Sequence, residues 1–222
     1  MNNTPHITET RPQLADPTAL GVFGLSVVTF VAASQKLGWT TGATYLVPWA
    51  LFLGAIGQIW ASTVDFKKNN FFGAIVLGVY GLFWAAVAMH WAIGQGWFGT
   101  VAASADVRQL AYACIAYFIF SLFILVAACE ANKVFAAILF LINILLPSLA
   151  LSILGVSPGL FTALAAWSEL LISFLGFYAA GAIFLNGYFG RQVLPLGAPF
   201  GFIRKGASPV ATLQARGKQA AA

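Results

Sequence analysis

Charged side chains are scarce in this sequence, and their scarcity limits the kind of surface that the chain can present. Only 8% of the 222 residues are Asp, Glu, Lys or Arg, while 60% are hydrophobic. Soluble domains carry about 25% charged residues, so a chain this poor in charge cannot cover a water-facing exterior. Most of its surface must therefore face lipid, and its length corresponds to one domain.

The sequence also lacks the residue groups that support most chemistry in membrane proteins. Its two cysteines, Cys114 and Cys129, lie in or beside one apolar stretch, where a helix would hold them roughly 20 Å or more apart, too far for a disulfide bond. We find no metal-ligand cluster, no His pair for haem and no Lys within an apolar run for retinal. A nucleophile–base motif of the intramembrane proteases and a Walker A loop are missing too. We expect neither a metal nor a cofactor, and we do not expect an enzyme.

Six long apolar runs are present, and each is long enough to cross a bilayer as a helix. A spanning helix needs roughly 20 mostly apolar residues, and the runs lack the polar alternation of strands in outer-membrane barrels. The runs cover residues 17–34, 45–64, 71–93, 109–128, 134–154 and 160–185. The sequence therefore predicts an all-α membrane protein with a six-helix transmembrane domain at 16–190. Residues 1–15 are expected to be a disordered N-terminal segment, and residues 191–222 a basic tail.

Basic residues are distributed unequally between the two sides of the predicted helices. One side carries only Lys36 and Arg108, whereas the other holds nine Lys and Arg residues. Because basic residues concentrate in cytoplasmic loops, both chain ends are predicted to be cytoplasmic in a multi-pass protein of the plasma (inner) membrane. The net charge of +5 is spread between and after the apolar runs, which argues against nucleic-acid binding. The nine residues are Arg11, Lys67, Lys68, Lys133, Arg191, Arg204, Lys205, Arg216 and Lys218.

Two amides lie within the predicted spans, where a polar group without a partner costs several kcal/mol. Gln58 follows Gly54 and Gly57, so it could form a helix–helix hydrogen bond or line a pore. Pro147 has no N–H, which frees the carbonyl of Asn143 from its helical donor. Asn143 could therefore kink the helix or line a polar path. We favour the path, because an amide N–H₂ can donate to a carboxylate.

Glu169 is the only acidic residue well inside a predicted span. A carboxylate there must be protonated, paired or in contact with water. No Lys or Arg lies within the other five predicted spans to pair with it. Two interpretations stay open: contact with an outer vestibule, or a proton-carrying site. His90, near the outer end of the third run, is expected to be interfacial. These features together predict a membrane transport or channel protein without an ATPase.

Three segments carry motifs at fixed spacing. Residues 16–25 read D-P-T-A-L-G-V-F-G-L; residues 54–58, 70–73 and 80–84 read G-A-I-G-Q, N-F-F-G and Y-G-L-F-W; residues 189–197 read F-G-R-Q-V-L-P-L-G. In this order they resemble the acetate uptake transporter family, which includes the bacterial succinate–acetate permeases. The resemblance covers about residues 16–197. The motif positions singled out are Asp16, Pro17, Leu20, Gly21, Gly24, Gly73, Phe83, Trp84, Gly190, Arg191 and Pro195.

The resemblance implies an antiparallel six-helix protomer with its own pore, assembled as a homohexamer. It implies transport of acetate and, in some members, succinate or other short carboxylates, by proton-coupled uptake or channel-like flux. It places an apolar constriction at Leu25, Tyr80 and Ile142, where the family has Phe, Tyr and Leu. Asp16 replaces the family's Asn; it could cap the first helix, and it adds a negative charge near the inner mouth.

The residues suit a small carboxylate on their own terms. Acetate needs a small apolar pocket and a few hydrogen-bond donors, which Tyr80, Gln58 and Asn143 could supply without a fixed positive charge. Weak, uncharged recognition also allows release, which conduction requires.

The expected partners are acetate, related carboxylates and membrane lipids. Two alternatives stay open: a conduit for ammonia or small neutral solutes, and a non-transporting membrane scaffold or sensor. For residues 189–197 an interfacial anchor, in which Pro195 ends the helical stretch, is favoured over substrate contact.

Overall fold

The structure is a computed structural model, and it describes residues 14–203 and 206. All regular elements in these residues are helical, and six segments are long and apolar enough to cross a membrane. This confirms the predicted six-helix fold. The expected disorder of residues 1–13 falls outside the described residues, as do Arg11, Lys205 and the end of the tail. The elements are α1 (Thr18–Lys36), α2 (Leu46–Trp49), η1 (Ala50–Gly57), α3 (Gln58–Lys67), α4 (Phe71–Gly94), α5 (Thr100–Ala103), α6 (Arg108–Cys129), α7 (Lys133–Ile153) and α8 (Pro158–Phe189).

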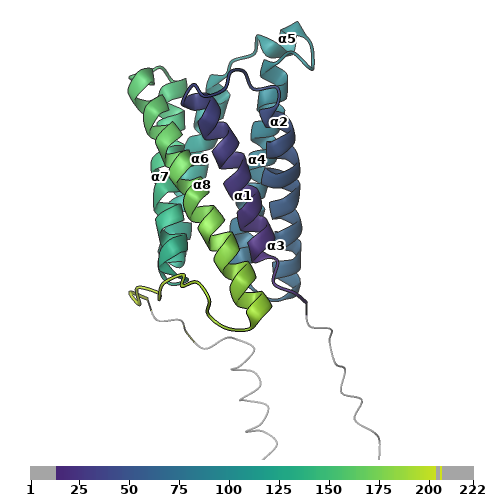
Figure 1. Ribbon diagram of the computed structural model, residues 1–222. Coiled ribbons are helices and arrows are strands. Elements are labelled where there is room, and N and C mark those ends of the chain that lie inside the picture. The colour runs from purple at the N-terminus through teal and green to yellow at the C-terminus, as the bar shows by residue number, and fades with distance from the viewer. Residues whose placement is uncertain (1–13, 204–205, 207–222) are drawn as a thin grey trace, which may run out of the picture.

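The helices form two groups that meet along α1 and α8 (Figure 1). In the first group α1, η1, α3 and α4 pack against one another, and in the second α7 packs against both α6 and α8. The start of α1 and the end of α8 lie at the same end of the bundle, which we call the terminal side (Figure 1). The opposite end, which carries α5, is the far side. The charge distribution predicts that the terminal side is cytoplasmic.

Several helices run beyond the predicted apolar limits. The first reaches Lys36 instead of residue 34, the second span reaches Lys67 instead of residue 64, and α8 continues to Phe189. Gly190 ends α8 in a left-handed conformation with φ of 61°, so the expectation that Pro195 ends the helical stretch is wrong. Helices continue past the apolar core until a residue leaves helical geometry. As a consequence, polar residues expected in loops stand on helices.

The second membrane span is interrupted by the π-helix η1. Its glycines allow neighbouring helices to approach closely: a Cβ atom on Gly54 would lie 2.9 Å from the Cγ atom of Trp84 in α4. On the other side, a Cβ atom on Gly24 of α1 would collide with the carbonyl oxygen of Leu53. Such π-helical segments occur often at functional sites. Here η1 ends directly before Gln58, which is 1% exposed.

The segment after α8 folds back onto the terminal side of the bundle. The side-chain oxygen of Asn186 accepts hydrogen bonds from the backbone N–H groups of Val193 and Leu194, at 2.6 and 3.0 Å. The Tyr178 hydroxyl donates to the carbonyl of Pro195 at 2.7 Å. The carbonyl of Leu196 then accepts from the N–H of Val134, the second residue of α7, at 3.2 Å. Residues 191–197 therefore tie the end of α8 to the start of α7.

Candidate functional site

Two cavities lie within the helix bundle, one toward each side. The terminal-side cavity has a volume of about 190 Å³, and the far-side cavity has a volume of about 240 Å³. They share no lining residue: along α4 the boundary falls between Tyr80 and Phe83, and along α7 between Ile142 and Leu145. Less than one helical turn therefore separates the two cavities on each of these helices.

The three residues expected at the constriction lie together at the inner limit of the terminal-side cavity. Leu25, Tyr80 and Ile142 are the lining residues farthest from the terminal side on α1, α4 and α7. Tyr80 and Ile142 are both buried, and Leu25 is partly buried. Gln58 lines the same cavity, so four of the five predicted pathway residues converge here. The structure thus brings together side chains from four helices, α1, α3, α4 and α7, that lie far apart in the sequence.

The Tyr80 hydroxyl is held by a polar network that the sequence did not reveal. Its oxygen lies 2.7 Å from the Oγ atom of Ser121 in α6. The Asn143 amide donates to the same Oγ atom at 3.0 Å and to the carbonyl of Leu139 at 2.8 Å. Asn143 and Ser121 line neither cavity, so the Asn143 amide is linked to the terminal-side cavity through Ser121 and Tyr80. A serine in an apolar run at the depth of Asn143 was the available signal for this network.

Two buried amide groups keep unused hydrogen-bonding capacity among the described residues. The Nε2 atom of Gln58 and the Oδ1 atom of Asn143 have no hydrogen-bond partner. Buried polar groups almost always find a partner in native proteins. Since Gln58 lines the terminal-side cavity, its N–H₂ group is available to an acceptor that enters there.

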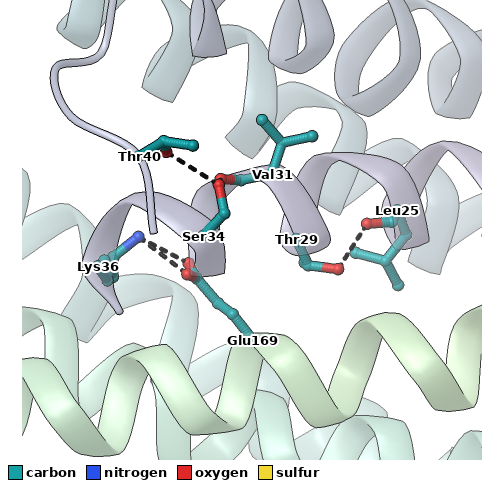
Figure 2. A network of polar contacts seen from close by, with 7 residues as sticks. All are labelled: Leu25, Thr29, Val31, Ser34, Lys36, Thr40 and Glu169. Carbon is teal, nitrogen blue, oxygen red and sulfur yellow. Dashed lines mark hydrogen bonds and ion pairs between the residues drawn. The ribbon is translucent and has the colours of Figure 1, made fainter. Parts of the chain in front are cut away.

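Glu169 has an ion partner that lies just beyond the predicted end of the first span. The Nζ atom of Lys36 lies 2.9 and 3.1 Å from the two carboxylate oxygens of Glu169 (Figure 2). The sequence assigned Lys36 to a loop, whereas α1 continues through it, and the long side chain spans the gap to α8. Both residues line the far-side cavity, and so does His90, which was expected to be interfacial.

A second buried acid, Asp65, stands on the terminal side. It was expected in the loop after the second span, but it lies within α3 and is fully buried. A Cβ atom on Gly73 would collide with the Oδ2 atom of Asp65. Gly73 is part of the N-F-F-G motif, and the missing side chain at this position makes room for the carboxyl group. Burial of the acid therefore gives a steric reason for the glycine.

Asp16 accepts hydrogen bonds at the start of α1. Its Oδ1 atom accepts from the N–H and the hydroxyl of Thr18, at 3.0 and 2.7 Å, and lies 3.8 Å from the Nζ atom of Lys68. Asp16 therefore satisfies the N–H of the first residue of α1, although Pro17 and not Asp16 holds the N-cap position. Burial raises the pKa of this carboxyl, but the Thr18 hydrogen bonds and the Lys68 ammonium outweigh it, so the pKa is lowered overall.

The other motif residues shape the helix contacts. A Cβ atom on Gly21 would lie 2.8 Å from the Cδ2 atom of Leu77, while Leu20 is exposed. Phe83 and Trp84 line the far-side cavity, and Arg191 is exposed at the end of α8.

Among residues 14–203 and 206, no three His, Cys, Asp or Glu side chains are placed to hold a metal ion.

These features define a class of protein: a helical membrane protein with two cavities on opposite sides of a thin apolar layer, the architecture of a channel or transporter. The sequence pattern of the GPR1/FUN34/yaaH family matches residues 2–198. The chain belongs to this family, which confirms the resemblance seen in its motifs.

Known relatives and a solved structure agree with this assignment. The succinate-acetate/proton symporter SatP of Escherichia coli K12 is 26% identical over 188 residues, covering 83% of this chain and 96% of the relative. An uncharacterized protein of Methanothermobacter thermautotrophicus is 28% identical, with 82% of this chain and 90% of the relative covered. The structure of the bacterial acetate channel SatP superposes with a TM-score of 0.76 and 25% identity, covering 83% of this chain and all of that chain. One of these relatives is named a symporter and the solved structure is named a channel, in agreement with a transport protein that is not an enzyme.

Proposed function

We propose that this protein moves acetate and related short carboxylates, including succinate, across the plasma (inner) membrane through the path that joins its two cavities. The observation that carries the proposal is the convergence of Leu25, Tyr80 and Ile142 at the inner limit of the terminal-side cavity. A permeating solute has to cross this layer to pass between the cavities. The named relatives, a succinate-acetate/proton symporter and an acetate channel, support the choice of substrate.

The chemistry of the layer suits a small carboxylate. Leu25 and Ile142 offer apolar contact to a methyl group, and Gln58 offers an N–H₂ group without another partner. When the Ser121 hydroxyl donates to the Tyr80 oxygen, the phenolic proton of Tyr80 is free for a carboxylate oxygen. None of these donors carries a fixed charge, so binding stays weak enough for rapid release.

We propose that α6 takes part in the contacts of the homohexamer that the family resemblance implies. In the most apolar stretch of α6, 22% of the residues are buried, whereas in the other five spans 39–50% of the residues of the corresponding stretch are buried. Large side chains such as Tyr112, Ile119 and Phe123 are exposed on this helix. A neighbouring protomer or lipid must cover them in the membrane. We assign the terminal side to the cytoplasm, in line with the excess of basic residues there.

Purified protein in liposomes tests the proposed function. Uptake of labelled acetate should exceed that of protein-free liposomes, and unlabelled succinate should compete with it. Flux that equals the protein-free background at every pH would contradict carboxylate transport and favour a scaffold. Inhibition by ammonium with no inhibition by succinate or formate would instead indicate a conduit for ammonia. Native mass spectrometry of the same preparation tests the hexamer.

A further inference from the structure

The Lys36–Glu169 ion pair joins the end of α1 to α8. Lys36 is in the last turn of α1, and Glu169 lies about 16 Å along α8 from the start of that helix. The Glu169 side chain is 2% exposed, while that of Lys36 is 15% exposed. Both residues line the far-side cavity, so the pair forms part of its wall.

The rest of the far-side cavity is mostly aromatic and aliphatic. Lys36 and Glu169 are the only lining residues with a formal charge at neutral pH. The other titratable groups that face the cavity are His90 from α4 and Cys114 from α6, and α7 contributes no titratable side chain, only the polar Ser152. A carboxylate solute that enters this cavity therefore meets one full positive charge, and Glu169 already neutralises that charge.

Hydrogen-bonding capacity remains at this ammonium. A lysine ammonium has three N–H donors, and the hydrogen bonds that it makes within the described residues go to the two oxygens of Glu169. The position at the C-terminus of α1 also favours a cation, because helix C-termini carry partial negative charge. The ammonium of Lys36 can therefore donate to a second carboxylate beside Glu169.

Glu169 and a carboxylate substrate carry the same chemical group and compete for the same ammonium. A buried ion that loses its partner is strongly unfavourable, so the ionised Glu169 holds Lys36 and excludes a solute anion. Protonation of one Glu169 oxygen by water-borne acid from the far side removes that negative charge. The solute anion then replaces it as counterion of Lys36, and one proton and one anion are loaded together.

We propose that Lys36 and Glu169 form a proton-linked binding site for a small carboxylate in the far-side cavity, with Lys36 as the anion ligand and Glu169 as its exchangeable internal counterion. This inference rests on the proposed transport function and gives it a coupling step. It concerns the far-side cavity and is separate from the layer at Tyr80.

Acetate uptake by proteoliposomes with buffered interiors tests the site. The wild type, Lys36→Gln, Glu169→Gln and the double variant are compared across external pH values from about 5.5 to 8. The ionisation of acetate itself changes with pH for all four proteins equally, so the difference between variants isolates Glu169. We expect the KM of the wild type for acetate to rise with pH as Glu169 ionises. The KM of Glu169→Gln should not show this Glu169-linked rise, and at the highest pH it should be about tenfold lower than that of the wild type.

The variants without Lys36 separate a binding role from a structural one. Lys36→Gln is expected to raise KM about tenfold, and the double variant should keep this high KM with no Glu169-linked pH dependence. Because the double variant contains no uncompensated ion, it remains informative even if a single variant does not fold. A double variant with the KM and pH profile of the wild type would show a purely structural pair and overturn the inference. Equal pH profiles for the wild type and Glu169→Gln would overturn it as well.

A binding measurement distinguishes this inference from the proposed function. Trp84 and Trp91 line the far-side cavity, so acetate binding should change tryptophan fluorescence of the detergent-solubilised protein. A fluorescence change that is lost in the double variant supports the binding site. It does so even if the liposomes show no flux, a result that would contradict the proposed transport function but not the site. An identical acetate titration in wild type and double variant contradicts the site while leaving transport intact.

Discussion

The hydroxyl oxygens of Tyr80 and Ser121 lie 2.7 Å apart and connect the two groups of helices next to the layer between the cavities. The Asn143 amide donates to the same Ser121 oxygen at 3.0 Å, so α4, α6 and α7 meet in one network. The aromatic ring that closes the terminal-side cavity is thereby held from outside the cavity. Changes at Ser121 or Asn143 should consequently alter the path without touching the solute.

Ser121→Ala should destabilise the protein and disturb the path. The substitution leaves the buried Tyr80 hydroxyl and the Asn143 amide without this partner, which costs about 1–3 kcal/mol. Thermal unfolding in detergent should show a lower Tm, and acetate uptake should change in the same variant. Ser148→Ala is the matched control, because the buried Ser148 hydroxyl donates only to the carbonyl of Ile144 in its own helix. Equal effects of the two substitutions would contradict the role of the network.

Tyr80→Ala should widen the layer and weaken selection by size. Removing the ring opens space beside Leu25 and Ile142, and we expect the ratio of succinate to acetate uptake to rise about tenfold. The measurement is the initial rate for each labelled solute in the same liposome preparation. An unchanged ratio in a folded variant would place the size-selecting layer elsewhere.

Tyr80→Phe separates the hydroxyl from the ring. The apolar layer keeps its shape, so size selection should persist, while loss of one hydrogen bond lowers acetate uptake about fivefold. Tyr178→Phe serves as the control, since the Tyr178 hydroxyl donates to the Pro195 carbonyl away from both cavities. If the two variants lose the same amount of uptake, the Tyr80 hydroxyl has no specific role.

Gly24→Ala should destabilise the contact between α1 and the π-helix. The new Cβ atom meets a backbone carbonyl, that of Leu53, which cannot rotate away, and overpacking of this kind costs about 1–3 kcal/mol. A denaturation curve in detergent measures the loss. Gly181→Ala in α8 is the control, because nothing lies within 4 Å of its added Cβ atom. Equal stability of the two variants would argue against a tight contact at Gly24.

Asp16→Asn should increase acetate uptake about twofold at low ionic strength, because it removes a negative charge that repels the anion. The increase should be smaller at high salt, where screening already weakens this repulsion. The lowered pKa keeps Asp16 ionised at neutral and mildly acidic pH, so the difference should vanish only below the ordinary value of 3.8. The contacts of ionised Asp16 likewise stabilise the fold above its unfolded-state pKa and are lost as pH falls through the lowered one. Asp16 bonds to Thr18, which lines the terminal-side cavity, whereas Glu130 bonds to Ile203, which lines neither cavity, so Glu130→Gln should leave uptake unchanged. A salt-independent effect of Asp16→Asn would contradict an electrostatic cause.

Much of the architecture followed from local properties of the chain. Hydropathy and run length predicted six membrane helices, because a helix satisfies its own backbone hydrogen bonds within one segment of sequence. The family resemblance implied a constriction at Leu25, Tyr80 and Ile142, and the structure places all three on one cavity. Helix ends were less predictable, because apolar composition stops before helical geometry does, as at Lys36 and Asp65.

The contacts between distant positions could not be predicted in this way. Glu169 pairs with a lysine 133 positions away, and Tyr80 meets a serine 41 positions away. The sequence by itself determined a six-helix membrane protein of a recognisable family, because hydropathy and motif spacing are read along the chain. Only the tertiary structure decided that Glu169 is paired and that Asn143 acts through Ser121. The reach of a side chain depends on how its helix is rotated and packed, and that rotation is fixed by neighbours from elsewhere in the sequence.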